Sequence, residues 1–323
     1  MKTFLSIFPQ YIDPSDAIVI GVSGGVDSMV LLDLILKSHP KKSLVVVHFD
    51  HMLRGEDSDR DGEFVRNFCQ KNNLIFEFDR VDIGEIHRIS GGSLEAIARA
   101  ERYGFLEKVR ERYGAKYIIT AHHSDDQIET VLLNLIKGGK IQGLSGMSIL
   151  SGTLFRPLLF VKKSEILEYA HDFQIPYFED VTNGDMDFDR NKVRHQILPV
   201  LEEMNPSIHR TIGNLASYMQ ELNHFFDHKC QSWLKSSSEY TGVSGSFRVT
   251  DFLDLDGFFQ KEIIASLYRS AHDGSSQGLS SGLIDEILRY ISTAQGSTQK
   301  DIHCLSFSKK GGTIFYSRTH PEK

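Results

Sequence analysis

The chain has 323 residues, 40% of them hydrophobic, which is enough apolar material for one large domain or for two. Its formal charge of -7 excludes a uniformly basic surface, although a local basic patch is compatible with that sum. Cys69, Cys230 and Cys304 lie too far apart for a CxxC redox pair or a four-cysteine metal site. We expect free thiols and a cytoplasmic protein without a membrane partner, because we find no leader peptide and no apolar run of roughly 20 residues.

Short β-branched runs alternate with helical patterns along the first two thirds of the chain. The predicted strands are 17–22, 43–49, 74–79, 116–121 and 153–157, and the predicted helices are 28–37, 60–72, 93–113 and 125–137. This alternation predicts an α/β domain with a doubly wound, five-stranded parallel sheet of Rossmann-like type. Ligands of such sheets bind at the carboxyl ends of the strands, so we expect the chemistry in the loops that follow them.

The pattern changes near residue 205, where the apolar strand-like runs give way to helical periodicity. We expect a catalytic domain over 1–205 and a smaller, mainly helical domain over 206–323. Its predicted helices are 207–235, 251–271 and 282–292, and its predicted C-terminal hairpin turns at Gly311–Gly312.

The segment SGGVDS (23–28) follows the first predicted strand and begins the first predicted helix. Backbone N–H groups at a helix start favour an anion, and the Ser23 and Ser28 hydroxyls add donors. Gly24 and Gly25 let the backbone approach a phosphate, whereas Asp27 would repel one unless a cation such as Mg²⁺ lies between them. The alternative is a plain tight turn in which Ser28 or Asp27 caps the helix.

The string SGGxDS after a hydrophobic strand resembles the PP-loop of the ATP pyrophosphatases, and this resemblance implies cleavage of ATP between its α and β phosphates. Further motifs resemble those of the tRNA(Ile)-lysidine synthetases: VVHFDHMLRGEDSDRDGEFV (46–65), SLEAIARAERYGFL (93–106), ITAHHSDDQIETVLLNLIKGG (119–139) and DFDRNKVRHQILPVL (187–201). The likeness covers residues 17–201. Met52 departs from the family pattern, which usually has glycine after the histidine, and the chain length fits members that lack the last β domain.

The resemblance implies a ligase reaction in two steps. The carbonyl oxygen at carbon 2 of the wobble cytidine in a CAU-anticodon tRNA(Ile) attacks the α-phosphate of ATP, and pyrophosphate leaves. The side-chain amine of free L-lysine then displaces AMP and gives lysidine. ATP is therefore the expected co-substrate, Mg²⁺ the expected metal, tRNA(Ile) and lysine the expected partners, and a homodimer is one assembly open to the chain.

The resemblance also implies roles for individual residues. For catalysis we expect Asp27, His122 and Arg102, with Asp27 also as the metal ligand. For ATP binding we expect Ser23, Gly24, Gly25, Asp27, Ser28, His48 and Asp50. For substrate binding we expect Asp126, Glu129, Arg99, Arg190 and Arg194.

The motif around residue 122 supports several interpretations. His122, Asp126 and Glu129 are spaced i, i+4, i+7 and would share one helix face, where the carboxylates could contact lysine. Alternatively, Ser124 and Gln127 form a capping box, and the aspartates only complement the positive helix end. A divalent metal site made of the histidine and both carboxylates is a third interpretation. The adjacent His123 is expected to point elsewhere.

The arginines also have a structural interpretation, in which Arg99 pairs with Glu95 on a solvated helix face and the segment 190–195 is a basic turn. Otherwise they contact phosphate or tRNA. Lys137, Lys140, Arg156, Lys162 and Lys163 would extend this charge into a local basic strip.

Rival functions from other classes remain open on the sequence. A tRNA-thiolating PP-loop enzyme would activate the same carbonyl but needs cysteines that handle sulfur, and Cys69 has no partner nearby in the sequence. A non-catalytic nucleotide-binding protein would need the phosphate loop but not the acidic and basic clusters.

Overall fold

The computed structural model describes residues 1–53, 56–178, 189–236, 240–272 and 278–319. It divides into two compact units, Met1–Gln220 and Glu221–Lys323. The division falls within the long helix α11 (Ile208–Ser236). None of the described helices combines the length and the apolar composition that a membrane span requires.

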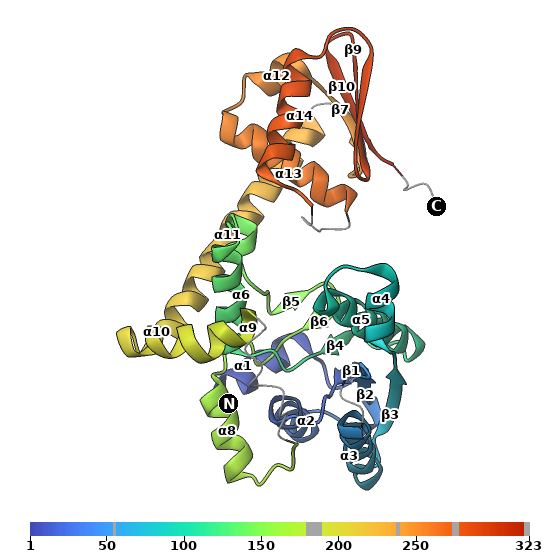
Figure 1. Ribbon diagram of the computed structural model, residues 1–323, viewed down its shortest axis with the longest axis vertical. Helices are drawn as coiled ribbons and strands as arrows, with labels where there is room; N and C mark the ends of the chain where they lie inside the picture. Colours follow the sequence, from blue (N-terminus) through green and yellow to red (C-terminus); the bar gives the residue numbers. More distant parts are fainter. Residues whose placement is uncertain (54–55, 179–188, 237–239, 273–277, 320–323) are drawn as a thin grey trace. The chain divides into compact units, whose positions relative to one another are not determined.

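The first unit is built on a six-stranded sheet with the order β3-β2-β1-β4-β6-β5 (Figure 1). Its strands are β1 (Ile18–Gly21), β2 (Leu44–Asp50), β3 (Ile75–Arg80), β4 (Tyr117–Ile119), β5 (Leu150–Ser151) and β6 (Leu154–Phe155). All five predicted strands are present and pair in parallel, which confirms the predicted fold class. The sixth strand, β5, pairs antiparallel with β6 and was not predicted.

Helices cover both faces of this sheet. They are α1 (Lys2–Tyr11), α2 (Val26–Ser38), α3 (Glu56–Asn72), α4 (Ile83–Ser90), α5 (Leu94–Arg112), α6 (Ser124–Ile136), α7 (Ile141–Leu144), α8 (Lys163–Asp172), α9 (Asp189–Lys192) and α10 (Leu198–Met204), and the start of α11 follows. The helices predicted over 28–37, 60–72, 93–113 and 125–137 correspond to α2, α3, α5 and α6. A π-helical turn, Val193–Ile197, joins α9 to α10.

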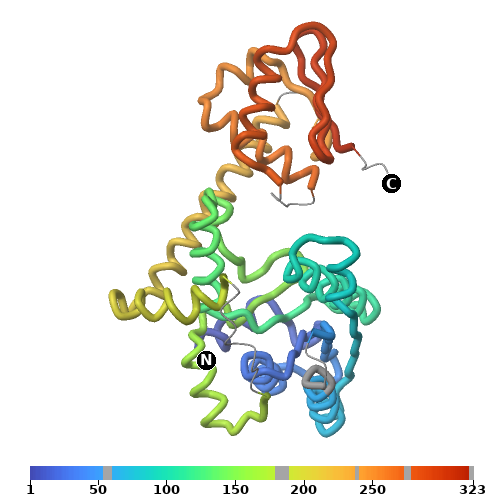
Figure 2. Tube along the Cα trace, in the orientation of Figure 1, coloured from blue at the N-terminus to red at the C-terminus, as the bar shows by residue number. Residues whose placement is uncertain are grey.

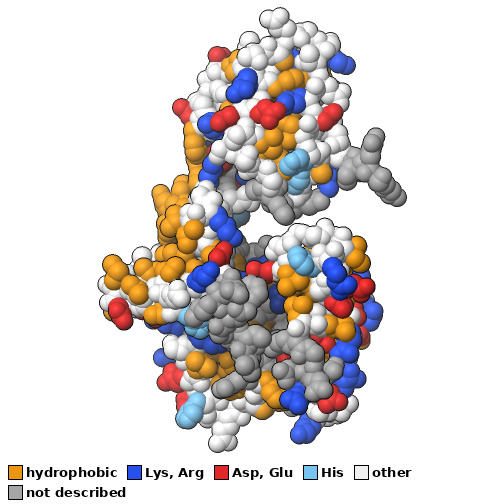
Figure 3. All heavy atoms as spheres, in the orientation of Figure 1, with side chains coloured by type: hydrophobic (Ala, Val, Ile, Leu, Met, Phe, Trp, Pro, Cys, Tyr) orange, Lys and Arg blue, Asp and Glu red, His pale blue; other side chains and the backbone are white. Residues whose placement is uncertain are grey.

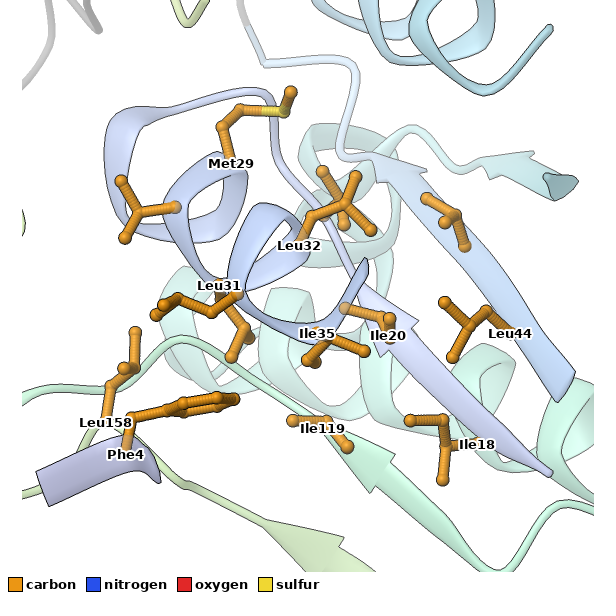
Figure 4. Packing of buried hydrophobic residues seen from close by; sticks show 14 of the residues in the cluster. Phe4, Ile18, Ile20, Met29, Leu31, Leu32, Ile35, Leu44, Ile119 and Leu158 are labelled. Atoms are coloured by element: carbon orange, nitrogen blue, oxygen red, sulfur yellow. The ribbon is translucent and has the colours of Figure 1, made fainter. Parts of the chain in front are cut away.

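Alternation along the strands divides the core between the two faces of the sheet. Ile18 and Ile20 of β1 pack with α2 on one face (Figure 4), whereas Val19 packs with Phe105 and Leu106 of α5 on the other. Successive side chains of a strand point to opposite faces, so a strand that is buried on both sides must be apolar throughout. This packing fixes the carboxyl ends of β1, β2 and β4 at one edge.

The second unit combines helices with a four-stranded antiparallel sheet of order β7-β10-β9-β8. Its chain is the part that runs through orange to red in Figure 2. Its elements are β7 (Ser244–Arg248), α12 (Val249–Leu253), α13 (Gly257–Ala271), α14 (Ser281–Thr293), β8 (Thr298–Ile302), β9 (Leu305–Lys310) and β10 (Thr313–Arg318). The predicted hairpin is confirmed, since β9 pairs with β10 across Gly311 and Gly312, both with positive φ. The sheet and helices enclose a core of their own.

Acidic and basic side chains are interspersed on the face shown in Figure 3. This mixture agrees with the negative net charge and with the exclusion of a uniformly basic coat.

Candidate active site

A cavity of about 290 Å³ opens at the carboxyl edge of the parallel sheet. Its walls come from the loops after β1, β2 and β4, from α5 and from the first turn of α6. The predicted site residues in these walls are Ser23, Asp27, Ser28, His48, Asp50, Arg102, His122 and Asp126. The cavity therefore brings together side chains that are up to about 100 residues apart in the sequence, as the fold class leads one to expect.

The conformation of loop 23–28 is stabilised by hydrogen bonds within the loop. Gly24 has a φ of 94°, which a residue with a side chain rarely adopts. The Ser28 hydroxyl accepts hydrogen bonds from the N–H groups of Ser23 and Gly24, each 3.2 Å long, and donates to the Gly25 carbonyl at 2.9 Å. Gly25 is the N-cap of α2 without a side-chain bond, so neither Ser28 nor Asp27 caps that helix.

Asp27 lies between two cationic side chains from distant parts of the chain. Lys163 Nζ donates to Asp27 Oδ1 at 2.5 Å, and His123 Nε2 lies 3.8 Å from Asp27 Oδ2. The same His123 nitrogen lies 3.6 Å from Asp126 Oδ2. The expectation that His123 points elsewhere is therefore wrong: it joins the carboxylate of the loop to the carboxylate of α6.

The capping box at the start of α6 is present but displaced by one residue from the prediction. His123 is the N-cap, and its N–H donates to Asp126 Oδ2 at 2.9 Å. Gln127, predicted to reach back to Ser124, instead exchanges hydrogen bonds of 2.9 and 2.7 Å with the backbone of Met147. A buried amide takes the partners that the tertiary structure offers, and no local rule identifies them.

His123 is buried among three carboxylates, and their charges decide its protonation. Burial alone would lower the pKa of the imidazole, but Asp125, Asp126 and Asp27 outweigh burial and raise it. Burial likewise opposes ionisation of Asp126, whereas His123 and other neighbours hold the pKa of its carboxyl below the ordinary value.

His122 precedes α6 and so does not share a helix face with Asp126 and Glu129, contrary to the predicted spacing. Its Nδ1 lies 2.8 Å from Thr120 Oγ1. Burial lowers the pKa of His122 to about 3, and the positive charges of Arg156 and Arg102 act in the same direction. The imidazole in the cavity wall is therefore neutral at neutral pH.

Glu129 lies outside the cavity wall, with a fully buried side chain. Arg194 Nε donates to Glu129 Oε1 at 2.7 Å, and Arg190 Nε donates to Oε2 at 3.1 Å. Arg194 also reaches Asp126 Oδ1 at 3.3 Å, and Arg190 reaches Glu95 Oε1 at 3.3 Å. Glu95 thus pairs with an arginine from a distant helix, and the guanidinium of Arg99 lies over the Tyr103 ring.

A family model described as a PP-loop domain matches residues 2–201, which is more than half of the chain. The chain belongs to the PP-loop family. Loop 23–28, whose sequence resembles a PP-loop, follows the first strand of the matched domain.

Three curated relatives share the name tRNA(Ile)-lysidine synthase. A tRNA(Ile)-lysidine synthase of Thermotoga sp. (strain RQ2) is 38% identical over 226 residues, which cover 69% of this chain and 54% of the relative. One of Geobacillus kaustophilus (strain HTA426) is 30% identical over 299 residues, covering 91% of this chain and 64% of the relative. One of Bacillus cereus (strain ATCC 10987 / NRS 248) is 38% identical over 210 residues, covering 63% and 44%. The chain spans about half the length of the curated relatives it matches.

Among solved structures, the U34-tRNA thiolase NcsA from Methanococcus maripaludis with its [4Fe-4S] cluster is similar with a TM-score of 0.56. The match covers 68% of this chain and 79% of the thiolase, at 17% sequence identity. At that identity the likeness supports the fold of the PP-loop domain and nothing finer.

Two cations that were predicted for a surface strip belong to this region of the PP-loop domain instead. Arg156 is buried, with 5% of its surface exposed. Lys163, at the first position of α8, contacts Asp27 as described above. Neither the burial of Arg156 nor the contact of Lys163 can be predicted from the sequence, because the groups involved lie on separate elements.

Among the residues that the structure describes, no three His, Cys, Asp or Glu side chains are placed to hold a metal ion. The interpretation of His122 and both carboxylates as a self-contained metal site is therefore wrong for this PP-loop domain. Asp27 and Asp126 remain the carboxylates of the cavity that face the same imidazole nitrogen.

Proposed function

We propose that this chain is a ligase that forms lysidine at the wobble cytidine of CAU-anticodon tRNA(Ile), using ATP and free lysine. The observation that carries the proposal is the cavity in which the PP-loop meets His122, Arg102 and Asp126. The shared name of the curated relatives points to the same activity. A tRNA-modifying enzyme of this kind would act in the cytoplasm.

The strand order gives the nucleotide a direction in the cavity. His48 and Asp50 lie at the end of β2, next to the loop after β1, which in turn lies next to His122 after β4. We place the nucleoside of ATP at β2, the phosphates at loop 23–28, and the reacting α-phosphate towards His122. Asp50 is oriented for this by Arg80, whose Nη2 donates to Oδ2 at 2.9 Å.

Magnesium fits the donor set of the cavity when phosphate supplies part of the coordination shell. Mg²⁺ is usually held by one or two carboxylates together with substrate phosphates and water. Asp27 would hold the ion, together with phosphate oxygens and water. When bound, the ion would offset negative charge on the phosphates.

The first step needs donors where negative charge develops on the α-phosphate and on pyrophosphate. The N–H groups in the first turn of α2 and the Lys163 ammonium beside Asp27 would face the phosphate end. Arg102 Nε is buried and, within the described residues, has no hydrogen-bond partner, so it can donate to a bound phosphate. Neutral His122 can donate a hydrogen bond there without adding a charge that must be desolvated.

For the second step, the amino acid needs a carboxylate that it can reach. Asp126 lines the cavity, whereas Glu129 is buried beneath Arg190 and Arg194. We therefore propose Asp126 as the carboxylate that contacts a lysine ammonium. Glu129 then acts through the arginines, which it holds beside Asp126.

A sulfur-transferring function has less support. Cys69 and Cys230 are buried, and burial raises the pKa of each thiol to about 12. A thiol of this kind is neither accessible nor ionised, so neither Cys69 nor Cys230 can carry sulfur to a tRNA. The partly exposed Cys304 therefore has no second accessible cysteine to work with. A protein that only binds nucleotide would not need Asp126 and Arg102 in the wall of the cavity.

The deciding experiment incubates the chain with ATP, Mg²⁺ and an unmodified CAU-anticodon tRNA(Ile), with either lysine or sulfide. We expect tRNA-dependent pyrophosphate release and, with lysine only, a nucleoside with the mass of lysidine. Thiolated cytidine would support the sulfur-transferring function, and absence of tRNA-dependent pyrophosphate release would reject both. Sedimentation of the same sample tests whether the chain forms a homodimer.

A further inference from the structure

Arg156 is a buried cation without a carboxylate. It follows β6, and 5% of its surface is exposed. Its Nη1 donates to the Ser148 carbonyl at 2.8 Å, while its Nε is buried without a hydrogen-bond partner in the described part of the chain. No described carboxylate forms an ion pair with it, and the group that favours its charged form is the neighbouring Tyr103 side chain. Burying an unpaired charge is unfavourable, so we expect Arg156 to have a partner other than the described carboxylates, such as a bound anion.

The position of Arg156 connects it to the cavity. β6 is the parallel neighbour of β4, and the N–H of Thr120 donates to the Phe155 carbonyl at 3.2 Å. Arg156 and His122 therefore leave adjacent strands at the same edge of the sheet. Along that edge the order is β2, β1, β4 and β6. Arg156 is thus on the side of His122 away from the nucleoside end.

Other guanidinium groups converge on the same place. On α5, the guanidinium carbons of Arg99 and Arg102 lie 4.8 and 5.1 Å from the centre of the Tyr103 ring. Arg99, Arg102 and Arg156 each lower the pKa of His122 through their charge, in addition to its burial. Arg102 Nε, like Arg156 Nε, is buried without a described partner. Three guanidinium groups repel one another when they lie this close together, and an anion bound between them would offset that repulsion.

We infer that Arg156, together with Arg102 and Arg99, forms an anion site beside His122 that takes a phosphate group of a substrate. Guanidinium groups suit this role because their planar donors match phosphate oxygens. The inference rests on the proposed function for the source of the phosphate, which is either the pyrophosphate end of ATP or the backbone of the RNA. If the role of Arg156 were only to hydrogen-bond the Ser148 carbonyl, a neutral side chain with one N–H donor would be sufficient.

The test measures binding to the 323-residue chain without turnover. The probes are inorganic pyrophosphate and a synthetic RNA stem-loop with a CAU anticodon, each titrated by calorimetry. The variant Arg156→Gln keeps an N–H donor for Ser148 but removes the charge. Arg112→Gln, an exposed arginine at the end of α5, is the matched control.

We expect Arg156→Gln to weaken at least one probe by about tenfold or more, and Arg112→Gln to weaken neither. Loss of pyrophosphate affinity would assign the site to the nucleotide. Loss of RNA affinity, with a flatter salt dependence, would assign it to the RNA backbone. A folded Arg156→Gln chain that binds both probes as well as the wild type would overturn the inference.

If Arg156→Gln does not fold, the site is tested in the wild-type chain by nuclear magnetic resonance, which follows the Arg156 Nε resonance. Arg156→Lys, which keeps the charge, identifies the Arg156 Nε resonance by its loss. We expect that resonance to move when one probe is added, and no movement with either probe would reject the site. These measurements need no lysidine, so a chain that makes none but binds phosphate through Arg156 would refute the proposed function and leave the anion site standing.

Discussion

Lys163 Nζ lies 2.5 Å from Asp27 Oδ1, although 136 residues separate them in the sequence. The contact joins the first position of α8 to the loop after β1, and both side chains are partly exposed. A surface ion pair of this kind adds little stability, typically below about 1 kcal/mol. We therefore expect this ion pair to contribute to catalysis more than to stability, because Lys163 places a positive charge beside the expected phosphates.

We expect Lys163→Met to reduce tRNA-dependent pyrophosphate release by about tenfold or more, because a cation beside the developing charge is lost. The melting temperature should change little. Lys71→Met, at an exposed position in the last turn of α3, is the control and should be active. Equal activities of both variants would show that Lys163 only pairs with Asp27.

We expect Asp27→Asn to abolish tRNA-dependent pyrophosphate release, because a metal held by this residue would lose a charged ligand. The turn should keep its shape, because Ser28 and Gly24 determine it. Circular dichroism checks the fold. Turnover near the wild-type level in the folded variant would remove Asp27 from the mechanism.

Asp126 and Glu129 should differ in their effects, because one lines the cavity and the other is buried. We expect Asp126→Asn to raise the lysine concentration needed for half-maximal turnover by tens to hundreds of fold, about 2 to 3 kcal/mol, while tRNA-dependent ATP–pyrophosphate exchange persists. If exchange falls in parallel while lysine affinity is unchanged, Asp126 belongs to the ATP–metal site.

Glu129→Gln should act on stability. It leaves Arg190 and Arg194 without their buried carboxylate, so we expect a loss of about 2 to 4 kcal/mol in the free energy of unfolding. Urea denaturation measures this loss, with Glu111→Gln on the exposed surface of α5 as control. If the Glu129→Gln chain is as stable as the wild type but binds lysine more weakly, Glu129 contacts lysine and does not act through stability.

His123 should make stability depend on pH. Its pKa in the folded chain is raised above the ordinary value of about 6.5. The contribution of its charge to stability is therefore complete below about pH 6.5 and is lost as the pH rises through the folded-state value. We expect the stability difference between the wild type and His123→Gln to shrink between pH 6 and pH 9. A constant difference would mean that the charge of His123 contributes nothing.

Met52 has a φ of 52°, in the left-handed region where glycine is favoured. It stands where the resemblance leads one to expect glycine, and its N–H donates to Asp50 Oδ1 at 2.8 Å. We expect Met52→Gly to raise the free energy of unfolding by up to about 1 kcal/mol, since the left-handed conformation strains a side chain. Leu53→Gly, at a position without positive φ, should lower it instead. Equal losses in both variants would show that Met52 is unstrained.

The sequence by itself determined the parts of this protein that depend on local patterns. Apolar runs such as those of β1 and β2 are visible because burial on both faces leaves no polar position in a strand. The turn of loop 23–28 is visible because Gly24 needs a positive φ and Ser28 must satisfy nearby N–H groups. The carboxyl ends of parallel strands meet at one edge, so the strand pattern also indicated where the cavity would lie.

Only the tertiary structure decided which side chains face one another in that cavity. Lys163 reaches Asp27, and Arg194 covers Glu129, through contacts between elements that the chain order does not relate. His123 was misplaced because strand-like alternation was extended through a residue that caps a helix and turns the backbone. Arg156 was assigned to the surface because arginine is usually exposed, and only packing against neighbouring elements can bury it. Sequence periodicity indicates which face of a helix or strand is buried. The partner of each buried charge depends instead on which elements pack together.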